Sequence, residues 1–325
     1  MNGQITTGWV DIAGMAAYTA LPVGVRRPVG VLVAGEIFGV SGYARRMADR
    51  LAGLGHAVVV PDFNHRHELR PSPAPSRAPT APMAGPATAG PSTGPVAGTS
   101  PGSSVGSSAN PVVGPSGDAT AGTVAGSSTG LVQEGGEAGA GVAVAVDPVT
   151  GGPLGRVVEL PADAAGRERG LELAWLLRRE QVLDDARAAS EYLRRAGAWP
   201  AAAVGFSLGG HVVCSVAGEL GLAAAVALYP GWLTGTELPL SRPEPTLERA
   251  ARAPGRLVVL LGADDPIIDG AQQRAIGERL ETVVYPGASH GFAADERDTF
   301  HPASAQDAWR RIEEVLDEVR RSRTD

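Results

Sequence analysis

The chain has 325 residues but contains no lysine, only one cysteine and few aromatic side chains. All 28 basic residues are therefore arginine, a composition that is typical of a GC-rich genome and points to no particular function. The single cysteine, Cys214, excludes an internal disulfide and any metal site built from several cysteines. The formal net charge of -7 argues against a partner with a phosphate backbone, so we expect no nucleic-acid partner.

Long apolar runs and nucleotide-binding loops are also missing. No apolar run approaches the ~20 residues that a membrane span needs, so we expect no membrane partner. The N-terminal sequence MNGQITTGWVDIAGM lacks a basic start followed by an apolar block, which favours a cytoplasmic location. We find no glycine-rich phosphate loop and no dinucleotide fingerprint, so we expect no cofactor.

Residues 71–155 differ in composition from the rest of the chain. They consist mainly of Pro, Gly, Ala, Ser and Thr, with no aromatic residue and only five charged side chains. Such a segment cannot bury enough side chain to offset the entropy lost on ordering. We therefore predict a disordered low-complexity insertion within one domain formed by residues 1–70 and 156–325. The alternative, a linker between two domains, fails because the first half offers too few strands for a core of its own.

Apolar strand-like runs alternate with helical patterns on both sides of the insertion. The runs rich in Val, Leu and Ala that we predict as strands are TALPVG, RPVGVLVAGE, HAVVVPDF, AAAVGF, LAAAVALYP, GRLVVLLGADD and ETVVYPG. Apolar spacing predicts helices over residues 41–55, 171–197, 209–221, 271–280 and 303–321. The fold class is therefore α/β, with a mostly parallel, doubly wound sheet and helices on both faces.

Polar residues follow several of the predicted strands. In an open α/β sheet, ligands bind beyond the carboxyl ends of the strands, so these side chains should gather on one edge. The residues in question are Glu36, Asn64, His65, Arg66, Ser207, Asp264, Asp265, Ser289 and His290. They contain a serine, a carboxylate and a histidine in that chain order, which is the order of the catalytic triad in α/β-hydrolases.

The stretch VGFSLGGH contains the pentapeptide Gly205-Phe206-Ser207-Leu208-Gly209 at a predicted strand-to-helix junction. This context predicts a nucleophile elbow, in which small residues at Gly205 and Gly209 let helix and strand approach closely. Ser207 would be the nucleophile and His290 the general base that takes its proton.

The carboxylate that orients His290 has three candidates. We favour Asp265, because it ends the stretch GADD and is followed by Pro266, while Asp264 and Asp269 stay open as rivals.

Several motifs together resemble those of the dienelactone hydrolase family of α/β-hydrolases. The matching stretches, in family order, are GEIFGVSGYARRMADRLAGLGHAVVVPD, VGFSLGGH, ALYPG, LGADDPI and YPGASHGF, and the resemblance covers roughly residues 6–70 and 167–320. It implies an α/β-hydrolase fold and a hydrolase that cleaves an ester or lactone of a small molecule through an acyl-enzyme. We expect a monomer or homodimer.

The resemblance also implies roles for four further residues. Glu36 matches a glutamate that hydrogen-bonds the resting nucleophile, and Arg66 matches an arginine that binds a substrate carboxylate. The backbone N–H groups of Ile37 and Leu208 match the two donors of the oxyanion hole. From the residues alone, Glu36 would be a partly buried paired carboxylate and Arg66 a surface charge.

The chain departs from the family pattern at two site positions. Ser207 stands where the family characteristically has cysteine, and Ala294 stands where it can carry a second carboxylate-binding arginine; Arg297 is close but does not match. A hydroxyl is not held as an anion as a thiol can be, so Ser207 depends on His290 taking its proton during attack. The departures leave the substrate open, while ester or lactone hydrolysis stays the prediction.

The remaining candidate groups have simpler interpretations. Cys214 lies about 10 Å beyond Ser207 along the helix axis and is predicted to be a small buried residue. His211 is expected to pack rather than to act in acid–base chemistry, and Trp232 either walls the substrate pocket or fills the core. The loop with His65 and His67 has no clear third ligand, so we expect no metal site.

Two other functions stay open. One is a non-catalytic hydrolase-like binding protein, and the other is an interaction protein whose insertion, residues 71–155, is the functional part.

Overall fold

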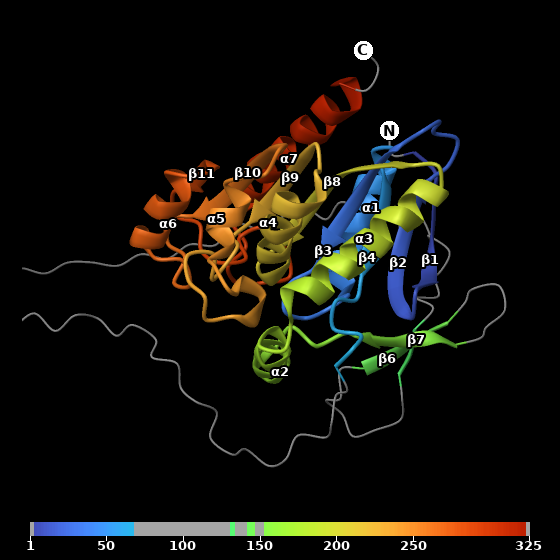
Figure 1. The fold of residues 1–325 in the computed structure, drawn as a ribbon, viewed down its shortest axis with the longest axis horizontal. Coiled ribbons are helices and arrows are strands. Elements are labelled where there is room, and N and C mark those ends of the chain that lie inside the picture. Colours follow the sequence, from blue (N-terminus) through green and yellow to red (C-terminus); the bar gives the residue numbers. More distant parts are fainter. Residues whose placement is uncertain (1–2, 68–130, 134–141, 147–152, 323–325) are drawn as a thin grey trace, which may run out of the picture. The chain divides into compact units, whose positions relative to one another are not determined.

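The computed structural model describes residues 3–67, 131–133, 142–146 and 153–322. Its main sheet has eight strands in the order β1–β2–β4–β3–β8–β9–β10–β11 (Figure 1). Their bounds are β1 Ile5–Ile12, β2 Met15–Pro22, β3 Val29–Ala34, β4 Ala57–Pro61, β8 Trp199–Phe206, β9 Ala224–Leu228, β10 Arg256–Gly262 and β11 Glu281–Tyr285. Strand β2 is antiparallel to both its neighbours, whereas every pair from β4 to β11 is parallel. The predicted α/β class with a mostly parallel sheet is confirmed.

Helices cover both faces of this sheet. Helices α3 (Arg179–Arg195) and α4 (Leu208–Leu220) lie in front of it in Figure 1 and contact each other and the central strands. Helices α1 (Gly42–Gly53) and α7 (Pro302–Ser322) pack together on the opposite face, where the Arg50 guanidinium lies 4.0 Å from the centroid of the Trp309 ring. Because both faces are covered, every residue of the strands AVVVP (β4) and AAVAL (β9) is buried.

The structure differs from the predicted elements in two places. The helix predicted over residues 171–197 is two helices, α2 (Ala164–Ala174) and α3, because the chain turns between them. In that turn, the N–H of Leu177 donates to the Ala174 carbonyl and the Leu177 side chain is buried. Strand β1 was not predicted; it is an edge strand that buries Trp9 and Ile12 among half-exposed residues, so its pattern is mixed.

A second, three-stranded sheet falls mainly inside the range predicted to be a disordered insertion. It consists of β5 (Leu131–Gln133), β6 (Val142–Val146) and β7 (Pro153–Val158), so the prediction is wrong for the residues of these strands up to 155. The alternating sequence VAVAV can bury one face: Ala143 and Ala145 are buried, and β7 contacts β1 and β2. Residues 71–130, 134–141 and 147–152 lie outside the described residues, and the prediction made for them stays a prediction.

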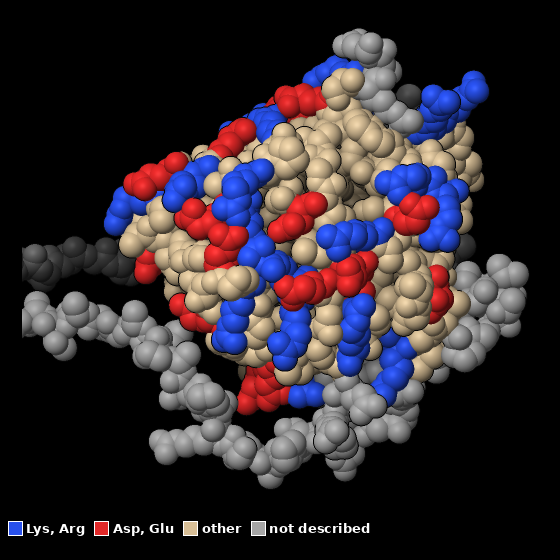
Figure 2. All heavy atoms as spheres, in the orientation of Figure 1, with Lys and Arg blue, Asp and Glu red and all other residues tan. Residues whose placement is uncertain are grey.

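The surface carries charges of both signs. Figure 2 shows basic and acidic side chains interspersed on the face that it presents. Helix α3 contributes exposed ion pairs such as Arg187–Asp184 and Arg194–Glu191. Within the described ranges, no helix combines the length and the apolar character required to cross a bilayer.

Helix α6 (Gly270–Gly277) begins with a capping box that involves one of the rival carboxylates. Asp269 Oδ1 accepts hydrogen bonds from the N–H groups of Ala271 and Gln272, each at 2.9 Å, and the Gln272 side chain accepts one from the Asp269 N–H. Asp269 therefore has a structural task at the start of α6 rather than a place beside His290.

We expect Asp269→Ala to lower the free energy of unfolding by ~1 kcal/mol, since two backbone donors of the first turn lose their acceptor. The measurement is urea unfolding followed by circular dichroism. Asp264→Ala is the matched control, because Asp264 is exposed and has no side-chain hydrogen bond to the described residues. Equal stability losses in the two variants would contradict the capping role.

Candidate active site

Ser207 lies at the junction between β8 and α4, in a backbone conformation with φ 54° and ψ -117°. Residues other than glycine rarely adopt a positive φ, so this position is strained. Its N–H donates to the Leu228 carbonyl of β9 at 3.0 Å, and its carbonyl accepts from the His211 N–H of α4 at 3.1 Å. Strand β9 and helix α4 therefore hold the strained turn in place.

Glycines let the backbones meet around this turn. A Cβ atom on Gly205 would lie 2.1 Å from the Gly209 carbonyl oxygen, and one on Gly209 would lie 2.1 Å from the carbonyl oxygen of Ala34 in β3. Neither position can hold a side chain unless the backbone moves. The predicted close approach of helix and strand at Gly205 and Gly209 is present.

Three predicted residues form a continuous chain of hydrogen bonds. Ser207 Oγ lies 2.9 Å from His290 Nε2, and His290 Nδ1 lies 2.8 Å from Asp265 Oδ2. The other Asp265 oxygen accepts from the N–H groups of Ile267 and Ile268, at 2.8 and 3.2 Å. The carboxylate is fully buried and acts only as an acceptor, so the proton sits on Nδ1 and Nε2 can accept from the Ser207 hydroxyl. Of the three candidate carboxylates, the structure brings Asp265 to His290.

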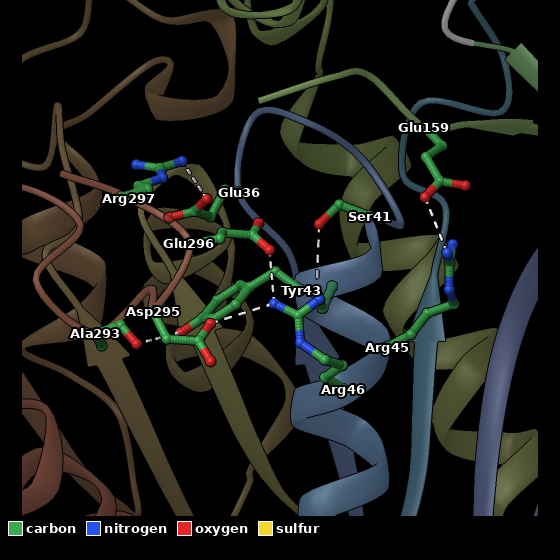
Figure 3. Close-up of polar contacts among 11 residues, drawn as sticks. Glu36, Ser41, Tyr43, Arg45, Arg46, Glu159, Ala293, Asp295, Glu296 and Arg297 are labelled. Atoms are coloured by element: carbon green, nitrogen blue, oxygen red, sulfur yellow. Dashed lines mark hydrogen bonds and ion pairs between the residues drawn. The ribbon is translucent and has the colours of Figure 1, made fainter. Parts of the chain in front are cut away.

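The segment that follows His290 is tied to helix α1, as Figure 3 shows. The Tyr43 hydroxyl donates to the Ala293 carbonyl at 3.2 Å, and Arg46 Nη2 donates to Glu296 at 2.6 Å. The histidine loop is thus held from the N-terminal half of the chain, which limits the movement of the imidazole relative to Ser207.

The chain is similar in sequence to a known protein family over most of its length. A sequence profile of the dienelactone hydrolase family matches residues 15–89 and 154–320, which is most of the chain. The chain belongs to the dienelactone hydrolase family. The family prediction made from the motifs is confirmed, and with it the α/β-hydrolase fold.

Individual relatives are more distant. The chain is 29% identical over 164 residues to the "Putative carboxymethylenebutenolidase" of Saccharolobus solfataricus, covering 47% of this chain and 60% of that one. It is 36% identical over 116 residues to the protein of the same name in Escherichia coli K12, covering 33% and 42%. The chain spans about half the length of the curated relatives it matches. A Klebsiella pneumoniae crystal structure named for a dienelactone hydrolase superposes with a TM-score of 0.61 at 20% identity, covering 97% of this chain and 99% of that one, which shows the fold.

Glu36 takes a partner different from the one that the family resemblance implied. It is buried just after β3 and forms an ion pair with Arg297 (Figure 3). The Arg297 guanidinium also lies 5.1 Å from the Phe38 ring centroid. Burial raises the pKa of Glu36, and the nearby Arg297 charge offsets this only in part. Its second oxygen, Oε1, has no hydrogen-bond partner among the described residues. The contact between Glu36 and Ser207 stays a prediction.

The two residues of the predicted oxyanion hole follow the ends of neighbouring strands. Leu208 is the first residue of α4, and Ile37 lies in the loop after β3, the strand next to β8. Helix α2 supports that loop, because a Cβ on Gly170 would lie only 2.5 Å from the Ile37 carbonyl oxygen. That both N–H groups bind the same substrate oxygen stays a prediction.

A small cavity of about 20 Å³ lies next to the elbow, and we name it the Glu36 cavity. Its lining includes Glu36, Asn64, Leu177, Leu208, Gly209 and Val212. Asn64 Oδ1, like Glu36 Oε1, is buried without a hydrogen-bond partner among the described residues. Both residues therefore line the Glu36 cavity together with the predicted oxyanion donor Leu208, and each has one buried acceptor oxygen without a described partner.

Arg66 is already paired within the protein. Its Nη1 and Nη2 atoms bind the two carboxylate oxygens of Asp185 in α3, at 2.5 and 2.7 Å, and His65 Nε2 lies 3.3 Å from Asp185 Oδ1. The Asp185 side chain is only 5% exposed. The structure thus pairs Arg66 with an internal carboxylate, where the resemblance implied a substrate carboxylate.

Tyr229 is a site neighbour that the sequence analysis did not single out. It follows β9 with φ 39°, is fully buried, and its ring lies edge-on at 5.1 Å from the His290 ring. Its N–H donates to the Leu260 carbonyl at 2.7 Å. Its place near the carboxyl end of the predicted strand LAAAVALYP, in the family stretch ALYPG, was the available signal.

The other candidates are not arranged for catalysis. Cys214 is fully buried, and burial raises the pKa of its thiol to about 12, so it is not a thiolate. Trp232 is partly buried and packs against the core. The part of the chain that the structure describes contains no group of three or more His, Cys, Asp or Glu side chains placed to hold a metal ion.

His211 is buried rather than exposed on its helix. Its Nδ1–H donates to the Gly231 carbonyl at 2.8 Å, and its Nε2 accepts from the Thr246 hydroxyl at 2.7 Å. Burial lowers the pKa of His211 to about 4, so it stays neutral at pH 7.

The close approach at the elbow predicts that Gly209→Ala destabilises the protein by several kcal/mol, roughly 3 or more, since the added methyl meets two backbone carbonyls. Gly277→Ala, at the end of α6, is the control because a Cβ there has nothing within 4 Å. Thermal unfolding of both variants is the measurement. A Gly209→Ala protein as stable as Gly277→Ala would show that the close contact between Gly209 and the β3 backbone tolerates a methyl group.

The neutral state of His211 predicts an acid-sensitive stability. The unfolded chain binds a proton on this histidine near pH 6.5, whereas the folded chain does so only near pH 4. Stability from this residue is therefore complete above pH 6.5 and is lost as the pH falls toward 4, by roughly 2–3 kcal/mol. The difference in free energy of unfolding between wild type and His211→Gln, measured in urea at pH 7 and pH 4.5, should shrink at the lower pH. An unchanged difference would contradict this assignment.

Proposed function

We propose that this protein is a serine hydrolase that cleaves an ester or lactone of a small molecule through an acyl-enzyme. The observation that carries the proposal is the hydrogen-bonded chain from Ser207 through His290 to the buried Asp265. Membership of the dienelactone hydrolase family supports hydrolase chemistry, and the names of the curated relatives, carboxymethylenebutenolidases, point to lactones.

The first half of the reaction forms the acyl-enzyme. His290 Nε2 takes the Ser207 proton while Oγ attacks the carbonyl carbon of the substrate, and Asp265 stabilises the resulting imidazolium. The N–H groups of Ile37 and Leu208 would donate to the oxyanion of the tetrahedral intermediate. The intermediate then collapses, the C–O bond to the leaving oxygen breaks, and that oxygen receives the proton from His290. In a lactone, the released hydroxyl stays attached to the acyl chain.

The second half reverses these roles. His290 takes a proton from water, the hydroxide adds to the acyl carbonyl, and Ser207 leaves with the proton returned by His290. The product is a carboxylic acid, and the enzyme is regenerated without a cofactor. The positive φ of Ser207 supports this assignment, because it holds Oγ in place without help from substrate.

The test is labelling with a fluorophosphonate probe and hydrolysis of simple aryl esters. We expect Ser207→Ala to abolish labelling and to lower kcat by roughly 10⁴-fold or more, because the attacking atom is removed. Cys214→Ala is the matched control and should label like wild type, since that thiol is buried and protonated. Labelling that survives in Ser207→Ala but is lost in Cys214→Ala would overturn the mechanism. A wild-type protein that is folded but neither labelled nor active would favour a binding protein instead.

A further inference from the structure

We propose that the site selects esters or lactones that are uncharged next to the scissile carbonyl and that carry a small hydrogen-bond donor there. The inference rests on the proposed hydrolase function and narrows its substrate class. It follows from the charges that the chain has already paired and from the two acceptor oxygens that it has left unpaired.

Arg66 is committed to Asp185. The pair is bidentate, and the carboxylate is buried against α3, so the Arg66 charge is compensated inside the protein. If Arg66 turned to a substrate carboxylate, Asp185 would be left as a buried anion with only His65 nearby, which is strongly unfavourable. Arg66 therefore offers no uncompensated positive charge to a ligand.

The region after His290 also offers no uncompensated positive charge to a substrate carboxylate. Ala294 is fully buried and uncharged, and Arg297 is paired with Glu36 and stacked on Phe38. A substrate carboxylate near Arg297 would meet the Glu36 carboxylate at the same point, and like charges repel more strongly where water is excluded.

One other arginine has an electrostatic influence on the site. Arg167 in α2 lies close enough to lower the pKa of Glu36, but it is exposed. Exposed arginines bind carboxylates weakly, because water screens the charge. Arg167 is therefore a competing candidate for binding a substrate carboxylate.

The Glu36 cavity indicates which group the substrate would carry in place of a carboxylate. Glu36 Oε1 and Asn64 Oδ1 are acceptors without described partners, and a carboxylate, which can only accept, would leave both unsatisfied. A hydroxyl or an amide N–H would donate to one of them. The volume of about 20 Å³ admits a group of about the size of a water molecule, which suits a hydroxyl or an amide end.

The test compares two lactones of the same shape. One is an unsaturated γ-lactone that carries a carboxymethylidene group, and the other has a primary amide in place of the carboxylate. We expect wild type to hydrolyse the amide with a kcat/KM at least ~10-fold higher than the carboxylate. Protection of Ser207 from the fluorophosphonate is measured in parallel, so that selectivity is read even when turnover is slow. Better hydrolysis of, or protection by, the carboxylate would overturn the proposal.

Asp185→Asn tests the cause. It removes the charge that compensates Arg66. Because the Arg66 side chain is 34% exposed, a substrate can reach it. We therefore expect kcat/KM for the carboxylate substrate to rise roughly tenfold relative to the amide substrate. Asp184→Asn removes the same charge one residue away, where the carboxylate binds Arg187 and acts on Arg66 only at longer range, and should change the ratio much less. Equal shifts in the two variants would contradict the role of the Arg66–Asp185 pair. If Asp185→Asn does not fold, the wild-type comparison alone decides.

Arg167→Ala tests whether Arg167 binds a substrate carboxylate. We expect it to leave the ratio between the two lactones unchanged, whereas a wild-type preference for the carboxylate that disappears in Arg167→Ala would assign carboxylate binding to Arg167. If Ser207 is not labelled at all, the proposed hydrolase function is contradicted. If Ser207 is labelled but the protein prefers the carboxylate substrate, only the proposed selectivity is contradicted.

Discussion

The site depends on one steric constraint, the contact between the start of helix α4 and the backbones of β3 and β8. Gly205 and Gly209 make this contact possible, because a methyl group at either position would overlap a carbonyl oxygen. The contact sets the positive φ of Ser207 and directs the first turn of α4 toward the end of β3. The hydroxyl of Ser207, the N–H of Leu208 and the loop that holds Glu36 and Ile37 therefore come together as a consequence of backbone packing.

Paired charges form a second layer around this packing. Glu36 with Arg297, and Asp185 with Arg66, are carboxylates withdrawn from water and compensated by arginine. In a chain without lysine, every such partner is a planar guanidinium that can bind both oxygens of a carboxylate, as Arg66 does. These pairs determine which charges the site presents to a ligand. They are the basis of the proposal that this site does not favour a substrate carboxylate.

The sequence by itself determined the elements and residues that local pattern controls. Alternation of apolar strands and helical spacing indicated the parallel sheet, because burial on both faces requires it. The junction around Ser207 and the order of Ser207, Asp265 and His290 followed from strand ends and glycine spacing. Asp265 was separated from its rivals by GADD and Pro266, and in the structure its carboxylate lies within hydrogen-bond distance of His290.

Tertiary structure alone decided the partners. Arg66 meets Asp185 across 119 residues, and Glu36 meets Arg297 across 261, so no local pattern signals either pair. The same holds for the small sheet of β5, β6 and β7, whose alternating Val and Ala residues lie in a stretch with the composition of an insertion and gain their stability from contacts with β1 and β2. Local sequence sets backbone preference and the order of chemical groups. Which charge neutralises which depends on surfaces that only folding brings together.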